Sequence, residues 1–467
     1  MRLAKVFLIV NALVVTEAYA TLPGDLDNNG TVSIAEVQRV INAFLGMVTE
    51  TPGIKTELVS RSTDGSVSGT AYNSEFPVIS GDGRYAAFVS YAANLAAGAT
   101  GQKRQILLHD RQAHTTELVS ATSAGVEGNN DSFAPTISAD GRYVAFESYA
   151  TNLAGGDANG VRDVYLRDRL TQTTTRVSVA AGGAEANSES YQPSISGDGH
   201  YVAFTSYASN LTGGVSGTAK SSVYLRDLQA GSNTLVSVTT SGTSGTQSSS
   251  NPAISADGSR IAFWSYDQNL VAGDVGSAWD IFLWDRNATP NISLVSVSSN
   301  GVQKAASTLE SMSRVVAPAI SADGLIVAFS TTADNLVEGD TNGLQDVFVH
   351  HIPSGQTIRA SESTDGVQAT GGDSPVGQGE RISLSSDGTW VAFTTAATNI
   401  SAGGSNVMIH NNFTGQTLPI TQSGTYASGA KGPAISSDGN LVVFMSGAQL
   451  DPSHASTGVF VHDRTVQ

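Results

Sequence analysis

A short motif, Pro-x-Ile-Ser-x-Asp-Gly, recurs along this chain in degenerate form, each time followed by an apolar run such as Tyr-Val-Ala-Phe. The glycine that closes the motif stands at seven positions, 51 to 66 residues apart: Gly83, Gly141, Gly199, Gly258, Gly324, Gly388 and Gly439. A period of this length is too long for one hairpin and suits four strands with their turns. Seven such units predict a seven-bladed β-propeller.

The second copy indicates the four strands of a unit, at 135–138, 143–148, 163–169 and 174–179. Asp140-Gly141, between the first two, favours a tight hairpin because glycine adopts positive φ without steric cost. The run 144–146 is continuously apolar, which is typical of a strand covered on both faces. With 49 glycines and 14% charged residues, the composition also favours an all-β fold of short strands and turns.

The last copy has three expected strands, at 433–436, 441–446 and 459–464. A spare copy of the fourth strand, Glu57-Leu58-Val59-Ser60, precedes the first unit and matches the run at 117–120. We therefore expect residues 57–60 to complete the last blade. Such a clasp would close the ring and leave no unfinished sheet.

The segment Ser-Ala-Asp-Gly-Arg-Tyr-Val-Ala-Phe at 138–146, followed by Asp-Val-Tyr-Leu-Arg-Asp-Arg at 163–169, resembles the TolB-type propeller repeat. The resemblance covers residues 55–467 and implies the propeller fold. Propellers of this type serve as partner-binding platforms, as companions of peptidase domains and occasionally as polysaccharide lyases. The resemblance therefore leaves the function open, because a fold alone does not specify chemistry.

The first 20 residues have a basic start, a short apolar run and small residues before Ala20, the pattern of a secretory signal peptide. They predict a secreted or periplasmic protein with no transmembrane segment after cleavage. The chain has no cysteine, so no disulfide would hold it together outside the cell. Its net charge of −17 disfavours nucleic acid and suits divalent cations.

Residues 25–36 match the calcium loop of an EF-hand, with Gly30 at its sharp turn. Short carboxylates and an amide can converge on calcium at this spacing, while a longer glutamate supplies two oxygens. The expected ligands are Asp25, Asp27, Asn29, Thr31, Ser33 and Glu36. The alternative is that Ser33 and Glu36 only form a capping box for the helix that follows.

That helix is indicated by an apolar stripe from Ile34 to Leu45 and ends at Gly46. A loop followed by one helix resembles a single repeat of a type I dockerin, and the resemblance implies a cohesin-like partner. Dockerins normally carry two repeats, and one is visible here. The expected organisation is a signal peptide at 1–20, a dockerin-like segment at 21–50 and the propeller at 51–467.

Two loops of the propeller place acidic and amide side chains at calcium-like spacing, and a third does so in part at Asp274 and Asp280. The possible ligands in the two complete loops are Asp157, Asn159, Asp163, Asp340, Asn342 and Asp346. These side chains would supply three oxygens per loop, fewer than calcium requires. The alternative is that they close Asx-turns in glycine-containing connections.

Histidine recurs late in the third strand of four units, at His109, His350, His410 and His462. Equivalent strands of adjacent blades are too far apart for shared metal coordination, so we expect a packing or surface role. Aromatic residues recur in the loops before the first strands, where they could stack on sugars or fasten the loops. They are Tyr72, Phe76, Phe133 and Tyr191.

These patterns predict a secreted, calcium-binding interaction or ligand-recognition propeller, tethered through its dockerin-like segment. The expected partner is an extracellular protein, cohesin-like proteins included, or a polysaccharide. The alternative is a polysaccharide-degrading enzyme or an accessory protein of carbohydrate catabolism. No catalytic constellation is identified, since the chain carries no Gly-x-Ser-x-Gly elbow and Ser386-Asp387-Gly388 lacks the spacing of a sialidase Asp-box.

Overall fold

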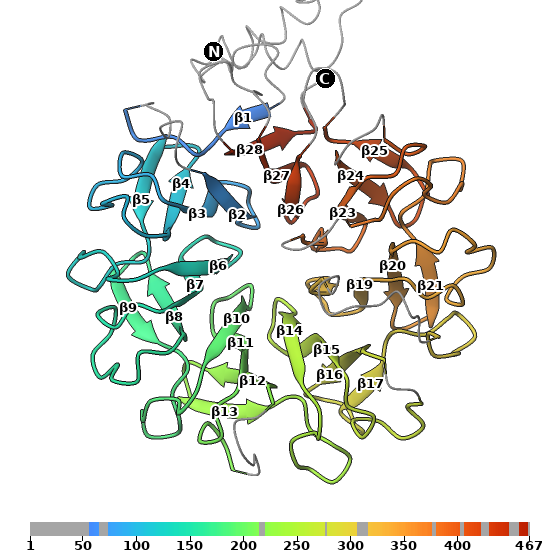
Figure 1. The fold of residues 1–467 in the computed structure, drawn as a ribbon, viewed down its shortest axis with the longest axis horizontal. Helices are drawn as coiled ribbons and strands as arrows, with labels where there is room; N and C mark the ends of the chain where they lie inside the picture. Colours follow the sequence, from blue (N-terminus) through green and yellow to red (C-terminus); the bar gives the residue numbers. More distant parts are fainter. Residues whose placement is uncertain are drawn as a thin grey trace, which may run out of the picture. The chain divides into compact units, whose positions relative to one another are not determined.

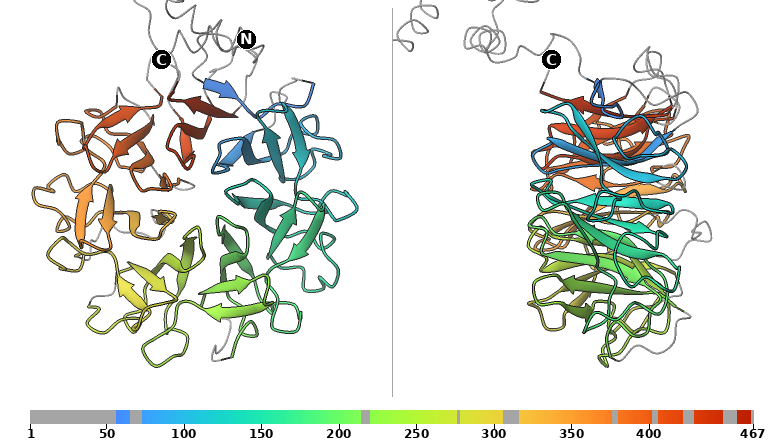
Figure 2. Two further views of the ribbon diagram at one scale, coloured as in Figure 1. Left: turned by 180° about the vertical axis from the view of Figure 1, so that it is seen from behind. Right: turned by 90° about the vertical axis from the view of Figure 1, so that its left-hand side faces the viewer.

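Seven four-stranded antiparallel sheets surround a central axis within the unit Thr56–Thr465, as the expected propeller requires (Figure 1). The computed structural model describes residues 56–64, 73–213, 220–275, 278–305, 316–375, 380–401, 406–421, 429–447 and 457–465. Seen from the side, the strands of each blade run across the thickness of the ring, from one face toward the other (Figure 2). Within the described residues, no helix is long and apolar enough to cross a bilayer.

Each blade runs from an innermost first strand to an outermost fourth strand. Blade 1 comprises β2 (Ser74–Ile79), β3 (Tyr85–Ser90), β4 (Gln105–Asp110) and β5 (Thr115–Leu118); blade 2 comprises β6 (Ser132–Ile137), β7 (Tyr143–Ser148), β8 (Asp163–Asp168) and β9 (Thr173–Arg176). Blade 3 comprises β10 (Ser190–Ile195), β11 (Tyr201–Ser206), β12 (Ser222–Asp227) and β13 (Ser232–Leu235); blade 4 comprises β14 (Ser249–Ile254), β15 (Arg260–Ser265), β16 (Asp280–Asp285) and β17 (Ile292–Leu294). Blade 5 comprises β18 (Ala319–Ile320), β19 (Ile326–Thr331), β20 (Asp346–His351) and β21 (Gln356–Arg359); blade 6 comprises β22 (Ser383–Leu384), β23 (Trp390–Thr395), β24 (Asn406–Asn411) and β25 (Thr417–Pro419). Blade 7 comprises β26 (Lys431–Ile435), β27 (Leu441–Ser446), β28 (Gly458–Asp463) and β1 (Thr56–Leu58).

The expected clasp is present in blade 7, where β1 from near the start of the chain pairs antiparallel with β28. Thr56 faces His462 and Leu58 faces Phe460 in this pairing. The paired strand is 56–58 rather than 57–60, but the Val59 N–H still donates to the Val459 carbonyl at 2.8 Å. The first and last parts of the propeller therefore share one sheet.

A serine or threonine hydroxyl holds the start of the third strand in all seven blades. It accepts a hydrogen bond of 2.9–3.1 Å from the N–H of the strand's second residue. The hydroxyls belong to Ser60, Ser120, Ser178, Ser237, Ser296, Ser361 and Thr421. In blade 2, β9 ends at Arg176, three residues before the strand end expected from the sequence. Beyond that end, the Ser178 hydroxyl connects the chain to the third strand.

The seven motif glycines have φ between 69° and 75°, so each lies in the left-handed region that glycine tolerates best. They also contact the preceding blade. A Cβ built on each glycine would lie 2.1–2.7 Å from the first residue of that blade's second strand: Leu441, Tyr85, Tyr143, Tyr201, Arg260, Ile326 or Trp390. The motif therefore marks both a hairpin turn and a contact between blades.

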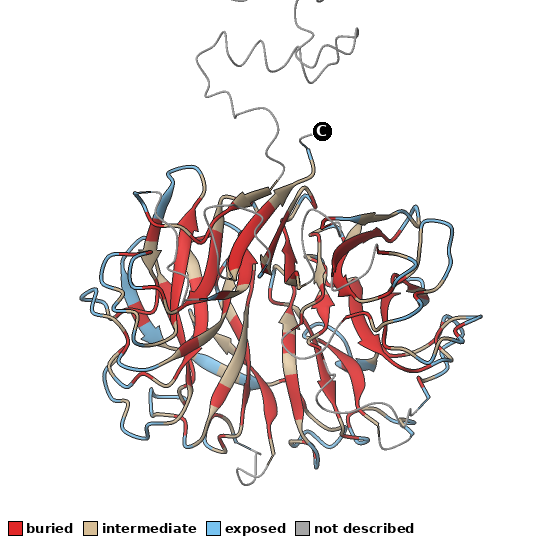
Figure 3. Ribbon diagram, turned by 45° about the horizontal axis from the view of Figure 1, so that its top comes forward, coloured by how far each residue is buried: buried red, intermediate tan, exposed pale blue. Residues whose placement is uncertain are grey.

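The apolar core lies between blades rather than in the middle of the ring. One cluster joins Ala145 and Val164 of blade 2 to Val202, Phe204 and Tyr224 of blade 3. Six similar clusters fill the other junctions. The second and third strands are accordingly buried along most of their length, as expected from their continuous apolar runs (Figure 3).

Candidate functional site

The proposed EF-hand loop, Asp25 to Glu36, lies outside the described residues, as do the signal peptide and the dockerin-like segment at 21–50. Its calcium ligands therefore remain a prediction. Tyr72 also lies outside the described residues. The other sequence-predicted positions can be placed in the propeller.

The acidic loop of blade 2 brings together two of its three predicted ligands, with Glu185 as an additional carboxylate. Ligand atoms of Asp157, Asp163 and Glu185 lie within 4.8 Å of one another. Arg176 Nη1 lies among them, 3.2 Å from Asp163 and 2.6 Å from Glu185. The Asp157 Oδ1 atom is buried and has no hydrogen-bond partner in the part of the chain that the structure describes. Calcium binding here remains a prediction, and it would have to compete with the guanidinium.

The third predicted ligand of this loop, Asn159, instead accepts a hydrogen bond from the Val161 N–H at 2.9 Å. Its amide also donates to the Ala186 carbonyl at 2.8 Å. In blade 5, Asn342 likewise accepts from the Leu344 N–H at 2.9 Å. Both contacts are Asx-turns, as the alternative interpretation of these loops expects.

In blades 5 and 4, the aspartates at the equivalent loop positions also form hydrogen bonds or ion pairs with other side chains. In blade 5, Asn342 donates to Asp346 at 2.8 Å, and Arg359 lies 3.4 Å from Asp340. In blade 4, the amide of Gln303 donates to both Asp274 and Asp280, at 2.7 and 2.8 Å. Burial raises the pKa of each strand-leading aspartate to about 6; these are Asp163, Asp280 and Asp346.

The four recurrent histidines each pair with a threonine of the neighbouring outer strand, at 2.8–2.9 Å from Nδ1 to Oγ1. The pairs are His109 with Thr116, His350 with Thr357, His410 with Thr417, and His462 with Thr56. Burial lowers the pKa of His350 and of His410 to about 4, so both are neutral at pH 7. The pairs lie in different blades, so the four histidines do not converge on one shared metal site.

Phe133 and Tyr191 lie in the first strands β6 and β10 rather than in the expected loops, and both belong to a series of rings and guanidinium groups. Arg104 lies over the rings of Tyr91 and Phe133, 5.1 and 5.3 Å from their centroids. Arg162 lies over Tyr149 and Tyr191, at 5.6 and 4.6 Å. These cation–π contacts connect neighbouring blades, so Phe133 and Tyr191 fasten one blade to the next.

Ring-to-ring contacts make the series continuous across blades 1 to 3. Phe133 meets Tyr149 edge-on at 6.4 Å between centroids, and Tyr191 stacks on Tyr207 at 5.9 Å. All of its members are half-buried. We call this series the aromatic arc; it comprises Tyr91, Arg104, Phe133, Tyr149, Arg162, Tyr191 and Tyr207. Partial exposure leaves ring surface for a ligand as well.

The first strands surround a central channel with a cavity of about 570 Å³. Four of these strands carry a bulge whose central residue has φ between 47° and 55°: Phe76, Ala134, Gln192 and Asn251. These residues line the channel. A bulge redirects a side chain relative to the regular strand, and here the bulges repeat around the axis.

Arg381 lines the same channel and was not singled out from the sequence. Its Nη1 donates to the Pro77 carbonyl of blade 1 at 3.5 Å, so the side chain of blade 6 extends past blade 7. Within the described part of the chain Arg381 forms no ion pair. Part of its surface is accessible from the channel, yet burial among the surrounding strands lowers its pKa to about 10.

Glu380, the preceding residue, is buried beside the channel. Its Oε2 accepts hydrogen bonds from Thr394 Oγ1 at 2.5 Å and from the Gly432 N–H at 3.2 Å. Its Oε1 has no hydrogen-bond partner within the described ranges, and burial raises the pKa of the carboxyl. Glu380-Arg381-Ile382 replaces the Phe133-Ala134-Pro135 pattern of the repeat, which is the signal that could have identified it.

Comparisons with known proteins place the chain by its fold. No protein-family model and no curated protein matches it. An oligogalacturonate lyase from Vibrio parahaemolyticus is 11% identical, with 87% of this chain and 96% of that chain covered and a TM-score of 0.51. An oligogalacturonate lyase in complex with manganese is 12% identical, with 85% and 91% covered and a TM-score of 0.50.

TolB from Acinetobacter baumannii is 16% identical, with 75% of this chain covered and a TM-score of 0.39. The match spans 64% of the length of that TolB chain. At 11 and 12% identity, the similarities to the two lyase structures establish a shared β-propeller fold and leave the specific function undetermined.

Proposed function

We propose that this chain is an exported ligand-recognition protein whose propeller channel binds an anionic ligand, with carboxylated polysaccharides as the ligand class. The observation that carries the proposal is Arg381, a guanidinium in the channel without an ion pair. A desolvated charge is costly unless an opposite charge compensates it. A ligand carboxylate would supply that charge and could accept two parallel hydrogen bonds from the guanidinium.

The rest of the channel suits a sugar chain. Gln192 and Asn251 bring amide groups to the lining, and Phe76 brings an aromatic ring. Hydroxyl groups of a sugar can exchange hydrogen bonds with amides, while its apolar face can stack on a ring. The half-buried aromatic arc offers further ring surface on blades 1 to 3. Since the whole chain carries a net charge of −17, attraction of an anion depends on this local cation.

Replacement of Arg381 should separate this site from general surface binding. We expect Arg381→Gln to weaken binding of pectate, a carboxylated polysaccharide, roughly ten- to hundredfold, because a charged hydrogen bond is lost. Arg286→Gln is the matched control, since Arg286 is exposed and stacks on Tyr201. Titration calorimetry in a calcium chelator, with neutral dextran as a second probe, measures the effect. Equal pectate affinity of Arg381→Gln and the wild type would contradict the proposal.

A polysaccharide-degrading enzyme is the second candidate, and Glu380 favours it. A carboxyl with a raised pKa and an unpartnered oxygen can act as a general base beside a bound sugar. Two solved structures with the same fold are described as oligogalacturonate lyases. Incubation of pectate with the wild type and with Glu380→Gln tests this candidate. Release of unsaturated sugar ends by the wild type and its loss in Glu380→Gln would support it, and no release would count against it.

We further propose that the segment 21–50 binds calcium and tethers the propeller to an extracellular protein, with cohesin-like proteins among the candidates. The support is the complete ligand pattern of the loop at 25–36. Calcium should be required for partner capture from the culture supernatant, and capture should be lost with chelator or in an Asp25→Ala/Asp27→Ala variant. Mass spectrometry of the captured proteins provides the measurement. Capture that is indifferent to both changes would exclude the tether.

A further inference from the structure

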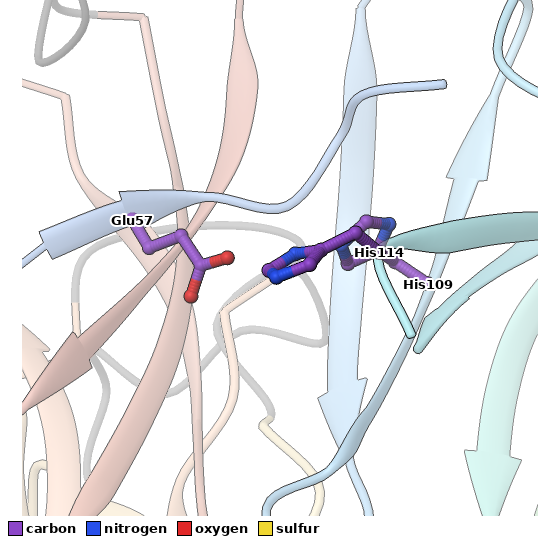
Figure 4. A group of neighbouring side chains, drawn as sticks. All are labelled: Glu57, His109 and His114. Carbon is purple, nitrogen blue, oxygen red and sulfur yellow. The ribbon is translucent and has the colours of Figure 1, made fainter. Parts of the chain in front are cut away.

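A mixed cluster of histidine and glutamate lies beside the clasp of the ring. Glu57 belongs to β1 of blade 7, His109 to β4 of blade 1, and His114 to the turn between β4 and β5. One ligand atom of each lies within 4.8 Å of the others. The Glu57 carboxylate points toward the two imidazoles across the junction of the blades (Figure 4). The recurrence of histidine along the sequence did not indicate this group, because Glu57 and His114 lie outside that repeat position.

The hydrogen-bond network fixes which nitrogen of His109 is free. The Thr116 hydroxyl donates to the Arg61 carbonyl, so its oxygen accepts the proton of His109 Nδ1, at 2.9 Å. His109 is therefore the Nδ1–H tautomer, an assignment that follows from the network. Its Nε2 then carries a lone pair. The side chain is fully buried, and this nitrogen has no hydrogen-bond partner among the residues that the structure describes.

We propose that Glu57, His109 and His114 form a binding site for zinc or a similar divalent transition-metal ion. Two imidazole nitrogens and a carboxylate oxygen are a typical zinc ligand set, with a fourth position for water. Tetrahedral ligands about 2.0–2.2 Å from zinc lie roughly 3.4 Å apart. Since the ligand atoms lie within 4.8 Å of one another, each pair must approach by at most about 1.4 Å to reach this spacing. Exposed His114 and half-buried Glu57 have room to move, whereas His109 is fixed by packing.

The neighbouring cation leaves part of the carboxylate free. Arg111 lies 3.3 Å from Glu57 Oε2, and its Nη1 also donates to the Gly83 carbonyl at 2.9 Å. Oε1 is the oxygen left for a metal. Residues that hydrogen-bond to the ligands of a metal ion orient those ligands; Arg111 would do so for Glu57, and Thr116 for His109.

A metal ion at this place would join the closing strand of blade 7 to blade 1. The junction also contains the hydrogen bond from the Thr116 N–H to Thr63 Oγ1, at 3.2 Å. Because the chain has no cysteine, a metal ion would supply the cross-link that disulfides provide in many exported proteins. The site shares no residue with the lining of the channel or with the loop at 25–36. Its zinc chemistry also differs from that of an all-oxygen calcium loop.

Metal titration of the full chain tests the site. After removal of metals, and with calcium present to fill the loop at 25–36, we expect added Zn²⁺ to raise the urea midpoint of unfolding. His114→Asn should weaken zinc affinity at least tenfold and abolish most of that shift. Asparagine is chosen because His114 has φ 52°, a conformation that asparagine adopts readily. Glu57→Gln should act similarly, while His200→Asn, at an exposed histidine outside the cluster, should not.

Cobalt provides a direct readout of the ligands. Bound Co²⁺ should give the visible absorption of a tetrahedral site in the wild type and His200→Asn, and lose it in His114→Asn. A zinc-induced midpoint shift of equal size in the wild type, His114→Asn and Glu57→Gln would overturn the proposal. So would the absence of any zinc-induced shift in the wild type.

Discussion

A Gly199→Ala variant is expected to lose roughly 2–5 kcal/mol of unfolding free energy, because one methyl group creates two problems. The residue has φ 74°, a left-handed conformation that alanine adopts only with strain. In addition, the new Cβ would lie 2.2 Å from Cδ2 of Tyr143, the first residue of β7 in the preceding blade. Relief would require the tyrosine or the whole hairpin to move away from the junction. Urea unfolding monitored by circular dichroism measures the loss.

The matched control is Gly125→Ala, where φ is 79° and nothing lies within 4 Å of the new Cβ. This variant carries the backbone strain without the collision, so its loss should be about 1–2 kcal/mol. The difference between the two variants isolates the contact between blades. Equal losses at Gly199 and Gly125 would show that the turn glycines are required for their φ alone.

The motif glycines show how far the sequence specifies this fold. Their spacing predicts the seven blades, and their partner aspartates predict the hairpins, since both depend on local conformation. Their second role depends on residues about 60 positions earlier, such as Tyr143 for Gly199. That contact becomes visible only when the blades are placed around the ring. The clasp was predictable because Glu57-Leu58-Val59-Ser60 repeats a strand with an assigned place in every other blade.

The candidate sites were less predictable, because each combines residues from different blades. Arg381 reaches from blade 6 to Pro77 of blade 1, and no spacing in the sequence encodes that distance. The aspartates of the blade 2 loop do gather, but Arg176 comes from the following strand and takes part of their hydrogen-bonding capacity. The loop pattern indicated that Asp157 and Asp163 lie close together, but it could not reveal the competing cation. In a ring of similar repeats, a ligand site depends on residues that depart from the repeat pattern, as Arg381 does.

Closing the ring covalently between β1 and β28 should stabilise it more than a disulfide between strands of a blade that follow one another in the sequence. The double variant Thr56→Cys/His462→Cys places two cysteines on directly opposed residues of β1 and β28. Opposed residues of antiparallel strands have Cα separations that suit a disulfide. The chain has no other cysteine, so mispairing within one molecule is impossible. The bond would enclose roughly 400 residues, for which the loss of chain entropy in the unfolded state corresponds to roughly 6 kcal/mol as an upper limit.

His410→Cys/Thr417→Cys is the matched control, because it replaces the same kind of histidine–threonine pair between the third and fourth strands. Its loop of roughly eight residues limits the gain to roughly 2.5 kcal/mol. Loss of the original hydrogen bond and any strain of the new bond should be similar in both variants, so the gap of about 3.5 kcal/mol reports the loop length. Urea unfolding of each variant with and without reductant measures both gains. If the two disulfides stabilise equally, the unfolded chain must already keep the two ends of the propeller close together. Pairing of β1 with β28 would then restrict the unfolded chain much less than the length of the enclosed loop suggests.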